Sequence, residues 1–171
     1  MEPRIITPPE SEPVTLEEVK EDLRIEHAED DARLNRLITE AREFIERRAQ
    51  MSLLTQTREA DLPAFPDGAI LLWGSRPIQS IVSVSYRAGG ADASADAASY
   101  YLHQNALYAV SGWPASGEFV TVRFIAGYAD AASVPGPLKI AIRVKVEELY
   151  DGKDRMALID ALLSNYLLLA A

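Results

Sequence analysis

Hydrophobic residues recur at helical spacing in two stretches near the start of the chain. Thr15 and Glu18 have the spacing of a capping box, which predicts the beginning of a short helix. A longer helix is predicted to follow the acidic residues 29–31, because carboxylates at a helix N-terminus interact favourably with its dipole. Its apolar stripe repeats every three or four positions and consists of Leu34, Leu37, Ile38, Ala41, Ile45 and Ala49.

From Leu53 onward, the pattern changes to short alternating stretches that are typical of β-strands. Turns are predicted at Gly89-Gly90 and around Gln104-Asn105, and the segment from Gly89 to Ser99 is predicted to continue as a mobile loop. Strands at such short spacing favour a small antiparallel sheet or barrel. The predicted strands cover residues 54–58, 69–73, 77–86, 100–102, 107–110 and 118–125.

Alternation also assigns faces within two of these strands. In the strand at 118–125, the face of Phe119 and Thr121 is predicted to lie opposite the face of Val120, Val122 and Phe124. The strand at 77–86 is predicted to place Ile78, Val82, Val84 and Tyr86 on one face. Ile81 lies on the opposite, more polar face, so part of that face is expected to be covered too.

Helical spacing returns after Pro135 and Pro137, and it predicts helices over residues 138–150 and 156–171. The first of these helices has a second apolar stripe of Ile140 and Val144, so a neighbour is expected on each side. The last residues, from Tyr166 to Ala171, carry no side-chain charge and are expected to be covered by another surface.

These elements predict an α+β fold, in which a bundle of two N-terminal and two C-terminal helices holds an inserted β module. The boundaries are an extended N-terminal arm at 1–14, a helical bundle at 15–50 and 134–171, and a β-rich module at 51–133.

Composition narrows the classes of function. With a net charge of -9 over 171 residues, the chain repels phosphate backbones and anionic headgroups, although DNA can still pass without binding. It contains no cysteine, and its longest uncharged run, 97–117, is too polar to span a bilayer.

Candidate chemistry is sparse. His27 has carboxylates nearby in the sequence, but an acidic loop that caps a helix explains them better than a metal site does. His103 fits an ordinary surface residue, and no phosphate-binding loop or serine nucleophile elbow is present. We therefore expect no catalytic residue, no metal and no cofactor. The arginines of the second helix alternate with glutamates, which is typical of a salt-bridged solvent face.

Three stretches in order resemble one family. They are Pro13-Val14-Thr15-Leu16-Glu17-Glu18-Val19-Lys20; Leu37-Ile38-x-x-Ala41 through Leu54-Thr55-Gln56-Thr57; and Ala126-Gly127-Tyr128 with Val134-Pro135-Gly136-Pro137-Leu138-Lys139-x-Ala141-Ile142. Together they are similar to head–tail connector (adaptor) proteins of long-tailed phages, prophages and gene transfer agents. The resemblance runs from about Pro8 to the final helix. It departs at Ala49-Gln50-Met51-Ser52, where a Gly-Arg pair is common, and in the variable segment from Gly89 to Ser99.

The resemblance implies a non-enzymatic ring of roughly a dozen copies beneath the portal protein, at the head–tail interface of a virion made in bacterial cytoplasm. The ring would extend the DNA channel and offer a platform to a tail-side stopper or tail terminator protein. No membrane is implied. The residues proposed for these contacts are Tyr166, Leu167, Leu168 and Leu169 for the portal; Ile140 and Val144 for ring neighbours; and Gly89, Gly90, Asp92 and Asp96 for the tail side.

Two other classes remain open at this point. A β-type binding module for carbohydrate or peptide would need exposed aromatic residues, such as Tyr100, Tyr101 and Trp113, to line a groove. A hydrolase with an unrecognised site is disfavoured by the missing motifs.

Overall fold

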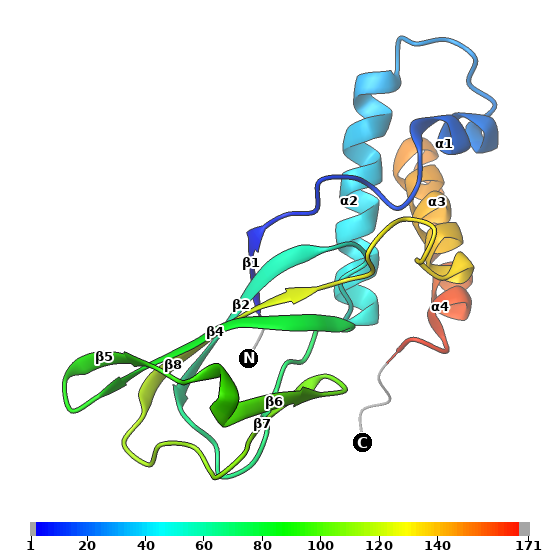
Figure 1. Cartoon of the computed structure of the whole chain (residues 1–171). Coiled ribbons are helices and arrows are strands. Elements are labelled where there is room, and N and C mark those ends of the chain that lie inside the picture. Colours follow the sequence, from blue (N-terminus) through cyan, green and yellow to red (C-terminus); the bar gives the residue numbers. More distant parts are fainter. Residues whose placement is uncertain (1–2, 168–171) are drawn as a thin grey trace. The chain divides into compact units, whose positions relative to one another are not determined.

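The structure, a computed structural model, describes residues 3–167 and consists of two compact units (Figure 1). The β unit contains Thr55–Gly127 together with the start of the chain up to Pro9. The helical unit contains Glu10–Leu54 and the chain from Tyr128 onward. The β unit is thus inserted between two halves of the helical unit, and the α+β class is confirmed.

The helical unit is built from α1 (Leu16–Leu23), α2 (Asp31–Ala49), α3 (Gly136–Asp151) and α4 (Met156–Leu163). Its first helix begins with the predicted capping box: Glu18 N–H donates to Thr15 Oγ1 at 3.1 Å, and Thr15 N–H donates to a Glu18 carboxylate oxygen at 2.7 Å. The prediction for the last helix was wrong in length. α4 ends at Leu163, and residues 164–166 form a turn.

One hydrophobic core fills the helical unit. The stripe predicted on α2 is buried in it, except for the partly buried Leu37. Leu138, Ala141 and Ile142 of α3 belong to the same core, as do Ile159 and Leu163 of α4. Tyr166 and Leu167 pack against its edge and remain partly exposed. The packing of α2 on α3 and of α3 on α4 therefore unites the N-terminal and C-terminal halves of the chain.

A buried charge cluster lies within this unit. Arg42, whose side chain is only 3% exposed, donates to Glu12 and to Glu46, both at 2.8 Å. Glu46 also accepts from the backbone N–H of Leu53 at 2.7 Å. Arg42 thus ties the segment before α1 and the chain after α2 to the middle of the helix.

The β unit consists of two antiparallel sheets rather than a closed barrel, as far as residues 3–167 show. The larger sheet has the order β1-β2-β8-β4-β5, and the smaller has the order β3-β7-β6. The strands are β1 (Arg4–Thr7), β2 (Gln56–Ala64), β3 (Ile70–Leu71), β4 (Ile78–Ala88), β5 (Ala91–Ser94), β6 (Tyr100–His103), β7 (Ala106–Ala109) and β8 (Glu118–Ala126).

The pairing of β4 with β8 is irregular, and the prediction that Val82 lies on the buried face of β4 is wrong. The register shifts between Ile81 and Ser83, so Val82 is an extra residue opposite β8. A bulge of this kind re-aims the side chains that follow it. Val82 is consequently 53% exposed, whereas Ile81 packs against the core. The alternation predicted for β8 is confirmed, because Val120, Val122 and Phe124 are fully buried.

The segment after Gly89-Gly90 is ordered into structure and is not a loop throughout, contrary to the prediction. The turn itself is confirmed, and both glycines have the positive φ angles that such turns require. The chain then returns as β5, paired with β4 from Ser85↔Ser94 to Ala88↔Ala91. Asp96 caps the short 3₁₀ helix at Ala97–Ser99 by accepting from Ala98 N–H at 2.9 Å.

A separate hydrophobic core fills the β unit, with Phe124 as its largest fully buried side chain. At its edge, Phe65 stacks on Trp113 with ring centroids 4.9 Å apart and also meets Tyr86 edge-on. Gly117 lies directly against Phe65: a Cβ atom at that position would come within 2.4 Å of the ring.

Gly117→Ala is therefore expected to destabilise the β unit by about 1–3 kcal/mol, the usual cost of overpacking. Urea unfolding followed by tryptophan fluorescence would measure the change. Gly68→Ala is the matched control, because nothing lies within 4 Å of a Cβ built there. Equal stability of the two variants would contradict the expected clash.

Candidate docking site

No catalytic centre is visible in the described part of the chain. Within residues 3–167, no group of three or more His, Asp or Glu side chains is placed to hold a metal ion. Over the same residues, no helix combines the length and apolar character needed to cross a membrane.

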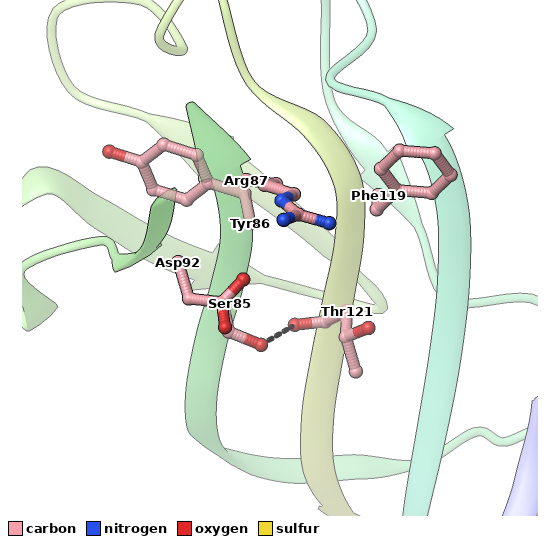
Figure 2. A pocket seen from close by; sticks show the side chains of 6 residues that line it. All are labelled: Ser85, Tyr86, Arg87, Asp92, Phe119 and Thr121. Carbon is pink, nitrogen blue, oxygen red and sulfur yellow. Dashed lines mark hydrogen bonds between the residues drawn. The ribbon is translucent and has the colours of Figure 1, made fainter. Parts of the chain in front are cut away.

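A pocket of about 430 Å³ opens on the β unit where β4, β5 and β8 meet (Figure 2). Three consecutive residues of β4 line it, and the register brings Asp92 of β5 opposite Arg87. The complete lining consists of Ser85, Tyr86, Arg87, Asp92, Phe119 and Thr121. The pocket therefore joins an apolar ring to one positive and one negative side chain.

Phe119 is the most exposed large hydrophobic side chain of the pocket, at 70%. It also has a φ angle of 50°, which non-glycine residues seldom adopt. The β4–β8 register is irregular at the same place, between Ser85 and Arg87. Because strained backbone is found preferentially at functional sites, Phe119 is a candidate contact residue.

Hydrogen bonds position the polar side chains of the pocket around the phenyl ring of Phe119. Arg87 donates from two of its nitrogens to the carbonyl of Gly90, at 3.1 and 3.3 Å, which ties it to the hairpin turn. Its guanidinium reaches over β8 on the side of Phe119 (Figure 2). Ser85 Oγ donates to the Thr121 carbonyl at 3.5 Å, and Thr121 Oγ1 donates to Asp61 at 2.7 Å.

A charge network continues across the neighbouring strands. The Glu59 carboxylate on β2 accepts from Arg123 on β8 at 2.6 Å and pairs with Arg4 on β1. Arg4 also pairs with Asp61. Although Glu59 is buried, it is paired from both sides, so three neighbouring strands are joined through this carboxylate.

The predicted tail-side residues lie near this pocket but not all in it. Asp92 lines it, and Gly89-Gly90 form the turn that holds Arg87. Asp96 instead caps the 3₁₀ helix; burial, together with this nearby carboxylate, raises the pKa of Tyr100. Arg87 and Phe119 were not selected from the sequence, although alternation had placed Phe119 opposite the buried face of β8.

The residues of the helical unit that were predicted to contact other proteins differ in their exposed fractions. On α3, Ile140 is 47% exposed, whereas Val144 is 9% exposed and belongs to the core of its own unit. Nearby, Arg143 pairs with Asp22 of α1, and the hydrogen bonds of this pair raise the pKa of Arg143. Leu168 and Leu169 lie outside the described residues.

Comparison with known proteins now gives these surfaces a context. A family model described as phage gp6-like head-tail connector protein matches residues 13–85. No match was found among curated proteins. The resemblance to head–tail connectors, drawn from motifs in the sequence, is confirmed over these residues.

Solved structures extend the likeness to the whole fold. One similar chain, from the neck of an empty gene transfer agent (GTA) particle computed with C6 symmetry, has a TM-score of 0.83 at 20% identity. Another, from the neck of a native GTA particle computed with C12 symmetry, has a TM-score of 0.82 at 18% identity. Both matches cover 100% of this chain and 97% of the other. Together, these matches show that the chain shares its fold with chains from GTA necks.

The aromatic residues proposed for a ligand groove are not grouped in one. Tyr100 and Trp113 pack against the core of the β unit, and the Trp113 indole N–H donates to the Gly68 carbonyl at 2.8 Å. Only Tyr101 of the three is exposed. This arrangement disfavours the carbohydrate- or peptide-binding alternative.

Proposed function

We propose that this chain is a head–tail connector that forms a ring of roughly a dozen copies beneath the portal of a tailed phage or gene transfer agent particle. The observation that carries the proposal is the match in fold, over the whole chain, to chains from GTA necks. The connector family model, which matches residues 13–85, supports the same role independently. In the particle, the ring extends the DNA channel and offers a platform for tail components.

The helical unit supplies the contact with the portal in this proposal. Tyr166 and Leu167 hold the start of the last segment against the helical core, and Leu168 and Leu169 follow without an intervening charge. Burial of such apolar side chains in the portal is favourable by the hydrophobic effect. Ile140 is the ring-neighbour residue with the larger exposed fraction, and Val144 is the less accessible of the pair.

The β4–β5 hairpin supplies the tail-side contact. Its turn at Gly89-Gly90 and the pocket with Phe119 place an exposed aromatic side chain beside Arg87 and Asp92. Aromatic and arginine side chains are enriched among the residues that carry binding energy at protein interfaces. A tail-side stopper or tail terminator protein is the proposed partner. DNA passes through the ring without sequence-specific contact, which agrees with the acidic composition.

Substitution of Leu168 and Leu169 by serine together is expected to reduce attachment of the chain to portal-bearing capsids at least about tenfold, because hydroxyl groups replace the apolar anchor. Co-sedimentation of the purified chain with tail-less capsids would measure attachment. This double substitution is a sharper test than removal of Asn165–Ala171, which would also take away Tyr166 and Leu167 from the helical core.

Leu158→Ser provides the control, since Leu158 is an exposed leucine of α4 within the described residues. Circular dichroism would confirm that all variants are folded. If the double variant attached as well as the unmodified chain, the proposed portal contact would be wrong. Electron microscopy that found no ring of the unmodified chain at a capsid vertex would contradict the connector function itself.

A further inference from the structure

The small sheet of the β unit has one face on which several large side chains are exposed, among them Leu71, Tyr101 and Val110. The cross-strand partners Tyr101 and Tyr108 stack there with ring centroids 5.5 Å apart, and His103 meets Tyr108 edge-on. The opposite face packs inward through Ile70, Leu102 and Leu107. We define the aromatic face as the outward set Leu71, Tyr101, His103, Tyr108 and Val110.

Alternation along each strand, together with the pairing of β3 and β6 with β7, brings these side chains to the same face of the small sheet. Leu71 and His103 are both partners of Ala106, at the two sides of β7. Val110 continues the ladder one residue beyond β7, with its N–H donating to the Ser99 carbonyl at 2.9 Å. Leu71, Tyr101 and Val110 are exposed large hydrophobic residues, so the surface is apolar as well as aromatic.

The aromatic face also lacks charge, in contrast to the rest of the chain. The 21 residues from 97 to 117 contain no Asp, Glu, Lys or Arg, and neither does β3. A charged partner surface would lose its hydration here and gain no ion pair in return. The surface that fits this face is therefore itself uncharged.

We infer that the aromatic face is a contact between neighbouring copies of this chain, an inference that rests on the proposed ring. Each copy carries a net charge of -9, so two copies repel each other wherever acidic surfaces meet. Every copy carries the same excess of acidic over basic side chains, 26 against 17, so charged contacts between copies are repulsive on average. Contact through an uncharged face removes this cost, and the apolar side chains supply the attraction.

Geometry within the face favours a tight contact. The two tyrosines are already held in a stack across β6 and β7, so little side-chain freedom is lost when they are covered. Contacts between copies in a closed circular assembly are heterologous, which means that the aromatic face of one copy meets a different face of the next copy. The pocket with Phe119 involves other strands and stays available for the tail-side partner.

A photo-cross-linking amino acid at position 101, in the full chain within purified particles, tests the inference directly. The expected product is a covalent dimer of this chain, identified by mass spectrometry of the joined peptides. Val82 is the matched control position, because it is 53% exposed against 52% for Tyr101 and lies on the other sheet of the same unit. The chain has no cysteine, so disulfide cross-links cannot confuse the result.

A charge substitution gives the second measurement. Tyr101→Glu is expected to lower incorporation into particles at least about tenfold, while Val82→Glu leaves it within about twofold. Cross-links from position 101 only to another protein, or no cross-link at all, would overturn the inference while leaving the connector function intact. Absence of the unmodified chain from particles would instead overturn the connector function, and this inference with it.

Discussion

Replacement of Arg42 by alanine is expected to lower the free energy of unfolding of the helical unit by about 3–5 kcal/mol. The guanidinium is almost fully buried and pairs with Glu12 and Glu46. Without it, the buried Glu46 carboxylate loses an ion-pair partner at 2.8 Å, while the hydrogen bond from the N–H of Leu53 stays. Removal of one partner from a buried ion pair is one of the few single changes that destabilise a domain this strongly. Urea unfolding followed by circular dichroism would measure the loss.

Arg47→Ala on the same helix is the control, because the Arg47 side chain is exposed and its contact to Glu43 is long, at 3.8 Å. Its effect is expected to stay within about 0.5 kcal/mol. Adding Glu46→Gln to Arg42→Ala should restore part of the lost stability, since the amide carries no charge. Similar losses from Arg42→Ala and Arg47→Ala would show that the buried cluster does not stabilise the unit.

Phe124→Ala is expected to destabilise the β unit by about 3–5 kcal/mol, because the substitution leaves a cavity at the centre of its core. The measurement is the midpoint of urea unfolding from tryptophan fluorescence, since both tryptophans, Trp73 and Trp113, belong to this unit. Phe119→Ala on the same strand is the control, because its ring faces outward. If both substitutions cost the same, the assignment of buried and exposed faces on β8 would be wrong.

Local sequence signals predicted much of this fold for identifiable reasons. The capping box at Thr15 and Glu18 is complete within four residues, so no distant contact is needed to recognise it. The long stripe on α2 and the strict alternation on β8 reflect burial against a single core, which a periodic pattern records directly. The Gly89-Gly90 turn depends on φ angles that glycine adopts easily.

The sequence-based predictions failed mainly where pairing with another strand decides the conformation. Val82 faces outward because a register shift against β8 inserts one residue, and alternation within β4 alone cannot reveal that shift. β5 has only small side chains and Asp92, so its strand character comes from hydrogen bonding to β4 rather than from its own residues. α4 was predicted too long, because the apolar residues from Tyr166 onward continue the helical pattern past Ser164 and Asn165, where the helix ends.

The candidate docking site was predicted in part. The hairpin turn and Asp92 were identified because small and polar residues mark a surface loop. Arg87 and Phe119 were missed because they join the pocket only through the pairing of three strands. The available signal was a phenylalanine that shares its strand face with Thr121 and Arg123.

The route of the chain between the two units has a mechanical consequence. The backbone passes between them three times, after Pro9, after Leu54 and after Gly127. These three passages connect to β1, β2 and β8, which are adjacent in one sheet, and Thr7↔Thr57 and Gln56↔Ala126 are paired at that end. A pulling force between the units would therefore enter one sheet through three covalent strands at the same end, and each strand would carry only part of the load.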